Sequence, residues 1–222
     1  MELSEVMRTT PSCREFTDRP VTDDDIYTVL DDARFAGSGG NRQGQHVIVV
    51  EDEAIRTAMR ELIVPVWRQY VAQVKAGERP FNPVIPTGVD LDAAVDEPAP
   101  TEFVDHFERV PALLVVVVDM RQLAAFDKDL DRYTLIGGGS VYPFCQNVLL
   151  AARNRGIGAT MTTFLAGREP QARELLRFPD HYALVATIAL GWPVRQVTKL
   201  SRKPVEEFTT VDTFDGEAFR AG

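Results

Sequence analysis

The chain has 222 residues, of which 45% are hydrophobic and 26% are charged, as in an ordinary globular protein that can bury a sizeable core. Its formal net charge of −9 argues against nucleic-acid or acidic-membrane partners, since both need basic patches. The longest apolar run, residues 111–118, is far shorter than the roughly 20 residues of a membrane-spanning helix. No signal segment opens the chain, and its two cysteines have no metal or redox spacing, so we expect a cytoplasmic protein.

The first 20 residues carry a small basic cluster. Arg8, Arg14 and Arg19 stand among threonine, serine and cysteine residues, and arginines scattered in this way are commonly no more than a solvated surface. Arg14 is the one that we single out. Ser12-Cys13-Arg14 forms a polar turn in which the guanidinium could meet a phosphate or a carbonyl oxygen of a cofactor.

A helix, a glycine-rich turn and a strand are predicted next. Thr22 caps the helix, aspartates fill its first turn, and apolar residues follow at helical spacing up to Ala33. The strand, residues 46–50, is apolar on both faces apart from His46 and is therefore predicted to lie in the centre of a sheet.

The turn between them reads Gly-Ser-Gly-Gly-Asn-Arg-Gln-Gly over residues 37–44. Its glycines let backbone N–H groups converge on one point, which makes a concavity for an anion or a ring. It is not a Walker loop, because Gln45 and His46 stand where lysine and serine or threonine are needed, and it is not a dinucleotide fingerprint, because Arg42 replaces the last glycine. Both motifs also require the order strand, loop, helix. We expect this turn to hold a cofactor of another kind.

An apolar stripe predicts a helix from Glu53, which Pro65 is expected to kink or break. Residues 77–108 are rich in proline and read as an irregular insertion before a strong strand at 112–118. Such an insertion is either a lid over a site or a solvated excursion. Its aromatic residues suit a lid, since exposed rings need something to cover: Phe81, Phe103 and Phe107.

A second buried helix is predicted after Gly137–Gly139, with Ser140 as its cap and Gly156 at its end. Its unusually broad apolar face fits a helix at the centre of a fold or in a subunit interface. A threonine-rich strand at 158–163 and a long strand at 182–190 follow.

The last segment contains a basic patch of Lys199, Arg202 and Lys203 before an acidic tail. In a chain this acidic, the patch either binds a phosphate or is simply exposed to solvent.

Groups that perform catalysis by themselves are not evident in the sequence. The three histidines lack zinc-type spacing, and no G-x-S-x-G elbow occurs. A cofactor cradle without a visible nucleophile or metal set indicates that a cofactor supplies the reactivity.

Five segments, in order, resemble motifs of the FMN-dependent nitroreductase family. They are Ser12–Phe16 for the R-S-x-R-x-F box, Ala36–Gln43 for A-P-S-x-x-N-x-Q, the central helix Gln146–Ala152 with its exit Gly156–Gly158, the closing strand Ala189–Pro193, and Arg202–Pro204 for the terminal R-x-P. The resemblance spans nearly the whole chain.

The resemblance implies an α+β fold in which a mixed sheet is flanked by helices. It implies a single nitroreductase-like domain over residues 1–222, with the lid-like insertion at about 77–108 and a C-terminal arm at about 195–222. It also implies an intertwined homodimer with two FMN sites at the interface. The arm would wrap around the partner.

The site residues follow from the same resemblance. Ser12, Arg14 and Arg202 would hold the phosphate and the pyrimidine edge of FMN, and Thr162 and Thr163 would lie beside the reactive N5 edge with Met161 adjoining. The partner subunit would contribute the glycine-rich turn through Ser38, Gly39, Gly40, Asn41 and Gln43.

Two positions depart from the family pattern. The family's first phosphate arginine falls at Pro11, so either Arg8 substitutes for it or a contact is lost. The usual proline before the serine is Gly37, which loosens the turn.

The implied reaction uses the flavin N5 as its centre and needs no catalytic side chain. NADH or NADPH would pass hydride to the flavin and leave, and an electron-poor small molecule such as a nitroaromatic or a quinone would take its place. Other readings stay open. One is a specialised flavin enzyme of the same superfamily, of the dehalogenase, ene-reductase or flavin-cleaving type, and another is a non-catalytic flavin-binding or storage protein.

Overall fold

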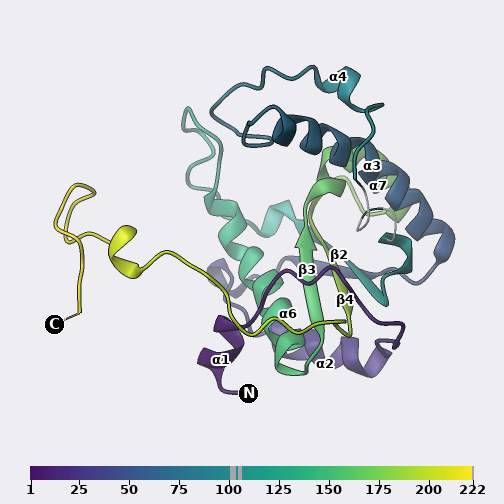
Figure 1. Cartoon of the computed structure of the whole chain (residues 1–222), viewed down its shortest axis with the longest axis horizontal. Helices are drawn as coiled ribbons and strands as arrows, with labels where there is room; N and C mark the ends of the chain where they lie inside the picture. Colours follow the sequence, from purple (N-terminus) through teal and green to yellow (C-terminus); the bar gives the residue numbers. More distant parts are fainter. Residues whose placement is uncertain (101–103, 105–106, 222) are drawn as a thin grey trace.

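The computed structural model describes residues 1–100, 104 and 107–221 (Figure 1). Its centre is a four-stranded sheet in the order β1 (Gln45–Val49), β2 (Ala112–Asp119), β4 (Tyr182–Gly191), β3 (Gly158–Thr162). Every strand pair is antiparallel, so the mixed sheet expected above is not found within one chain. Sequence cannot settle strand direction here, because the connections contain helices, as parallel crossovers also do.

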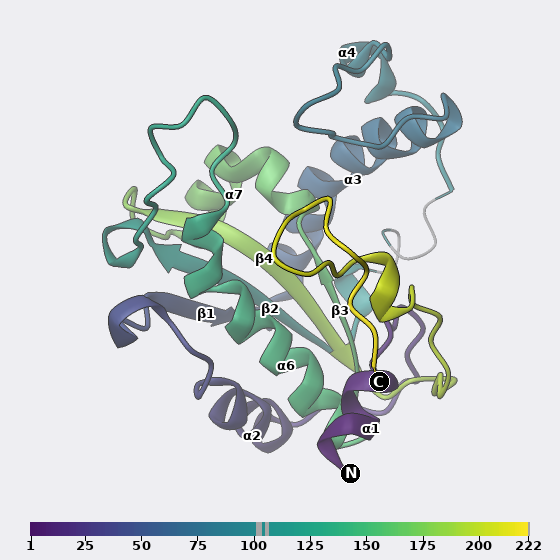
Figure 2. The ribbon, with the colours of Figure 1, turned by 90° about the vertical axis from the view of Figure 1, so that its left-hand side faces the viewer.

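Helices cover both faces of this sheet, as Figure 2 shows. On one face, α2 (Asp23–Ala33) and α6 (Tyr142–Asn154) enclose one apolar core. On the other, α3 (Glu53–Lys75) and α7 (Glu169–Leu176) enclose a second. The strand β2 is buried along its whole length, since its alternate side chains enter the two cores in turn. The other helices in the described part of the chain are α1 (Leu3–Arg8) and α4 (Leu91–Ala94).

Three local predictions are corrected by this arrangement. The strand β1 lies at an edge and pairs only with β2 among the described strands, so its outer residues are partly exposed. The helix α6 begins at Tyr142 without a side-chain cap, because the Ser140 hydroxyl is engaged elsewhere. The helix α3 runs unbroken through Pro65. Met59 and Ile63 before the proline and Trp67 after it pack on the second core and offset the lost hydrogen bond.

The insertion after α3 is attached to that helix rather than free in solvent. Gln69 Nε2 donates to the Leu91 carbonyl at 2.9 Å, and Arg68 Nη1 donates to the Val95 carbonyl at 2.8 Å. Trp67 Nε1 donates to the Pro100 carbonyl at 2.8 Å. Of the aromatic residues predicted to serve a lid, Phe107 is instead buried in the core and Phe81 is partly exposed, while Phe103 lies outside the described residues.

The C-terminal arm first runs along the N-terminal segment, where the Val194 N–H donates to the Glu15 carbonyl at 3.1 Å, and then extends away from the body (Figure 1). It carries a single short helical turn, Val205–Glu207, and one isolated bridge between Thr210 and Ala218. Its aromatic side chains are exposed, and Phe214 is 100% exposed. Among the described residues, no helix is long and apolar enough to cross a bilayer.

A buried carboxylate organises the connection between β2 and α6. Asp127 is 3% exposed and accepts hydrogen bonds from Thr134 Oγ1 at 2.7 Å, the Leu135 N–H at 2.8 Å and Arg132 Nη1 at 2.7 Å. The backbone and side-chain donors together hold the pKa of Asp127 far below its usual range. The carboxylate therefore replaces regular secondary structure as the organising element of this loop.

We expect Asp127→Asn to destabilise the protein at pH 7, because an amide offers one acceptor oxygen where the carboxylate offers two. A lowered folded-state pKa stabilises the fold fully at pH values well above the unfolded pKa of about 3.9, and this stabilisation is lost progressively as pH falls from there toward the lower folded-state pKa. The stability difference between wild type and variant should therefore be constant from pH 7 to about pH 5 and shrink progressively below that. Urea unfolding at several pH values measures this, and a difference independent of pH would contradict it.

Candidate functional site

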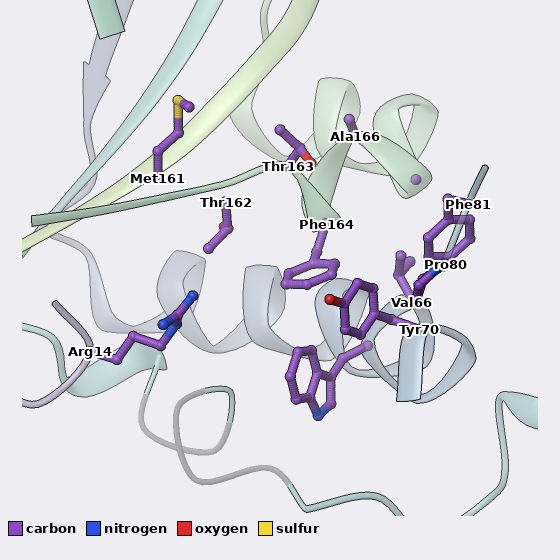
Figure 3. A pocket seen from close by; sticks show the side chains of 12 residues that line it. Arg14, Val66, Tyr70, Pro80, Phe81, Met161, Thr162, Thr163, Phe164 and Ala166 are labelled. Carbon is purple, nitrogen blue, oxygen red and sulfur yellow. The ribbon is translucent and has the colours of Figure 1, made fainter. Parts of the chain in front are cut away.

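A pocket of about 630 Å³ opens where β3 ends beside α3 (Figure 3). Its volume lies in the range of sites for small organic molecules. The lining residues come from the N-terminal segment, α3, the start of the insertion and the chain that follows β3. They are Arg14, Val66, Trp67, Tyr70, Pro80, Phe81, Met161, Thr162, Thr163, Phe164, Ala166 and Gly167.

Arg14 reaches this pocket because an extended segment is joined to the ends of β3 and β4. The Cys13 N–H donates to the Ala159 carbonyl at 2.9 Å, and the Thr17 N–H donates to the Trp192 carbonyl at 2.8 Å. The approach is so close that a Cβ at Gly158 would lie 2.6 Å from Cys13 Sγ. A Cβ at Gly191 would lie 2.5 Å from Phe16 Cγ. Glycine at these two positions thus permits the contact that places Arg14.

Hydroxyl groups without partners lie in and beside the pocket. The oxygens of Thr160, Thr162 and Thr187 are buried and make no hydrogen bond to any residue that the structure describes. Thr162 pairs with Thr187 across β3 and β4, so the three side chains share the face of the sheet that α3 covers. A buried hydroxyl without a partner is costly. Of these three residues, Thr162 is the one that lines the pocket.

An aromatic cluster forms the other end of the pocket. The rings of Trp67 and Tyr70 are stacked with centroids 5.5 Å apart, and Phe164 stands edge-on to both at 5.3 Å and 5.4 Å. In Figure 3, Arg14 lies at one end of the pocket and Tyr70 and Phe164 lie at the other, with Thr162 between the two ends. The pocket therefore has one cationic, polar end and one aromatic end.

A second, basic hollow of about 960 Å³ lies between α1 and the base of the arm. Arg8, Lys199 and Arg202 line it together with the hydroxyl residues Ser4 and Thr198. Among the described residues, no carboxylate lines this hollow. Three cations in an acidic protein, with hydroxyl donors beside them, make a site for a phosphate.

The glycine-rich turn adopts an unusual backbone. Gly40, Asn41 and Gln43 have positive φ angles of 61°, 53° and 50°, which is uncommon for residues other than glycine and is concentrated at functional sites. Two hydroxyls hold the turn: the Gly39 N–H donates to Ser140 Oγ at 3.1 Å, and the Gln43 N–H donates to Ser38 Oγ at 3.1 Å. The first contact is why Ser140 does not cap α6.

This turn lies far from the pocket within one chain. It leads into β1, whereas Thr162 ends β3, and these strands are the two opposite edges of the sheet. Three interstrand steps of about 4.8 Å each separate them. The turn and the end of β3 therefore do not line the same pocket within one chain.

The candidate residues thus fall into three groups. Arg14, Thr162 and Thr163 meet in the pocket, while the Met161 side chain turns away toward the opposite core. Arg8 and Arg202 meet in the basic hollow, and the turn 38–43 stands apart from both. Ser12 is exposed and lines neither site.

The aromatic end of the pocket escapes prediction from the sequence. Trp67 and Tyr70 are three residues apart on α3, which places them on one face of the helix. They sit beside the buried stripe and look like ordinary core from sequence. Their spacing of three residues was the only feature of the sequence that could have indicated this aromatic cluster.

The residues that line the pocket indicate which kind of molecule it can bind. A concave site with one cation, free hydroxyls and aromatic walls binds a small, partly polar ring compound. No group of three or more His, Cys, Asp or Glu residues in the described chain is placed to hold a metal ion.

The family follows from comparison with known proteins. The family model described as the nitroreductase family matches residues 7–192, so the chain belongs to the nitroreductase family, which confirms the resemblance.

Named relatives differ in activity. The chain is 28% identical over 229 residues to the nitrobenzene nitroreductase of Ectopseudomonas oleovorans, covering 94% of this chain and 96% of that protein. It is also 28% identical over 211 residues to the iodotyrosine dehalogenase 1 homolog of Caenorhabditis elegans, covering 92% of this chain and 59% of that protein. The solved NADPH:FMN oxidoreductase of Vibrio harveyi, complexed with NAD⁺, has a TM-score of 0.67 at 21% identity, covering 96% and 78% of the two chains. This last likeness establishes the fold, as expected.

Proposed function

We propose that the protein passes hydride from NAD(P)H, through FMN held between two copies of the chain, to an electron-poor organic acceptor. Membership of the nitroreductase family makes it an NAD(P)H-dependent flavin oxidoreductase with FMN as its cofactor. The observation that carries the finer proposal is the pocket, which Arg14 and Thr162 line together with aromatic side chains. Use of NAD(P)H also favours the cytoplasm as the place of reaction.

The pocket residues fit the ring system of a flavin. An isoalloxazine is a flat heterocycle with carbonyl oxygens and ring nitrogens along its edges, so it needs hydrogen-bond donors at its rim and apolar walls at its faces. Arg14 is such a donor. The Thr162 hydroxyl both donates and accepts, and no described residue satisfies it.

The basic hollow fits the phosphate of the same molecule. Arg8 and Arg202 are brought together there with Lys199, whereas Pro11 lines only a small crevice of about 10 Å³. We therefore assign to Arg8 the role that the family gives to the arginine at the position of Pro11. Arg14 lies six positions after Arg8 in the sequence, so the Cα atoms of the two residues are at most about 20 Å apart.

A second chain would complete the site. The turn 38–43 stands at the opposite edge of the sheet from Thr162, so its contribution to the flavin has to come from a partner. The arm supports the same arrangement, because most of its apolar side chains are exposed in their own chain. Val205, Phe208, Phe214 and Phe219 are 50%, 65%, 100% and 57% exposed, which is unusual for a folded monomer.

The proposed hydride transfer requires only a few side chains to take part. When bound, FMN supplies the centre that accepts and returns hydride, and NAD(P)H and the acceptor occupy the pocket in turn. For a quinone, NAD(P)H and one proton from solvent yield NAD(P)⁺ and the hydroquinone, which balances two electrons. Arg14 stabilises negative charge at the pyrimidine edge of the ring. Thr162 orients the ring, and the aromatic walls exclude water.

The purified protein should bind FMN and show a flavin absorption band near 450 nm, a property of the free cofactor. Anaerobic mixing with NADH or NADPH should bleach this band, and benzoquinone should restore it. A colourless protein that FMN cannot reconstitute would refute the proposal. Flavin that is bound but is not reduced by either nucleotide would indicate a storage protein instead.

Thr162→Val should leave the free energy of unfolding of the flavin-free protein unchanged or raise it, because the hydroxyl has no partner to lose. Flavin affinity should fall by roughly threefold to tenfold, as expected for one lost hydrogen bond. Thr187→Val is the matched control, since its hydroxyl is equally unpartnered but does not line the pocket. Equal flavin affinities in both variants and wild type would remove Thr162 from the site.

Replacing Phe208, Phe214 and Phe219 by serine should weaken dimerisation by at least about tenfold, because the arm would lose its apolar contacts with the partner. Sedimentation equilibrium measures this. Alanine at Glu206, Asp212 and Asp215 alters the same arm without removing apolar groups and serves as control. A monomeric wild-type protein would refute the shared site.

A further inference from the structure

A buried arginine beside α1 is not among the residues assigned to the flavin. Arg153 lies near the end of α6 and is 8% exposed. Its Nε–H is shared between the Thr9 carbonyl oxygen at 2.9 Å and Thr9 Oγ1 at 3.1 Å. Burial of a guanidinium is costly unless its donors are used, so the contact with Thr9 offsets part of that cost.

Thr9 is the residue at which α1 ends. Its N–H donates to the Val6 carbonyl at 3.2 Å, and its hydroxyl donates to the Glu5 carbonyl at 2.7 Å. The helix α1 has six residues, of which Val6 is the one that is buried. A helix this short is not stable by itself. Its position therefore depends on its contacts with α6, beside which it lies in Figures 1 and 2.

Arg8 is the last residue of α1 and directly precedes Thr9, so the two Cα atoms are about 3.8 Å apart. A fixed Thr9 thus fixes the point from which the Arg8 side chain enters the basic hollow between α1 and the base of the arm. The arm meets the same point, because Gln196 Nε2 approaches the Thr9 carbonyl oxygen at 3.5 Å. Arg153 connects this junction of α1 and the arm to α6.

We propose that Arg153 is a positioning residue for the FMN phosphate, which anchors Thr9 to α6 and thereby holds Arg8 in the basic hollow. The inference rests on the proposed function, in which Arg8 binds the phosphate, and deepens it. Pro11 offers a phosphate neither a cationic side chain nor a backbone N–H. The N-terminal segment therefore depends on Arg8 for this contact, and the placement of Arg8 depends on Arg153.

The affinities for FMN and for riboflavin, measured by equilibrium dialysis of the full chain, test this role. Riboflavin lacks the phosphate, so the ratio of the two affinities reports the phosphate contact. We expect Arg153→Met to lower FMN affinity at least about threefold and riboflavin affinity by less than about twofold. Arg8→Met should lower FMN affinity about tenfold or more, as for loss of a charge-assisted hydrogen bond.

Two further variants separate positioning from charge and from general stability. Arg155→Met removes the same charge two residues further on, where the guanidinium pairs with Asp32 of α2 at 2.6 Å, and it should keep the wild-type affinity ratio. Arg153→Lys keeps the charge but places a methylene group where Nε stands, so it should lower the ratio. It also serves as the test if Arg153→Met does not fold.

A double-mutant cycle tests whether Arg153 acts through Arg8. In the Arg8→Met background, Arg153→Met should cause no further loss of FMN affinity, because the side chain that it positions is already absent. An equal loss in both backgrounds would overturn the role of Arg153, as would a wild-type affinity ratio in Arg153→Met or in Arg153→Lys. A loss in Arg155→Met as large as that in Arg153→Met would overturn it as well. Wild-type protein that binds riboflavin as tightly as FMN would instead refute the phosphate site of the proposed function.

Discussion

The close backbone contact between the N-terminal segment and the ends of β3 and β4 is the constraint on which the site depends. Two hydrogen bonds join this segment to the sheet, from Cys13 to Ala159 and from Thr17 to Trp192. Both are possible because Gly158 and Gly191 present no side chain where Cys13 and Phe16 approach. The contact fixes Arg14 at the mouth of the pocket. It also orients the chain so that Arg8 lies beside the base of the arm.

The sheet order imposes the second constraint. With β1 and β3 at opposite edges, each chain carries the glycine-rich turn on one flank and the pocket on the other. The helices α2 and α6 fill one face of the sheet, and α3 and α7 fill most of the other. The pocket opens at the end of β3, beside α3.

The helices and strands could be predicted from the sequence where burial alone determines them. The all-apolar strand β2 and the stripes of α2 and α3 follow from periodicity, and Arg14, Thr162 and Thr163 line one pocket. The predictions failed where a contact between residues far apart in the sequence determines the local structure. Ser140 looks like a helix cap, but the Gly39 N–H, about a hundred residues away in sequence, takes its hydroxyl. The edge position of β1 and the aromatic cluster likewise depend on which surfaces meet, and local patterns do not encode that.

The placement of the glycine-rich turn and the pocket on opposite flanks has a consequence for mixed populations of chains. In a dimer built as proposed, each of the two active centres takes its turn from one subunit and its arginine from the other. A subunit defective in the turn and a subunit defective at Arg14 would therefore form one centre carrying both defects and one carrying neither. Two inactive proteins, once mixed and allowed to exchange subunits, would recover activity in half of the centres of every hybrid, a form of complementation that no monomeric enzyme can show.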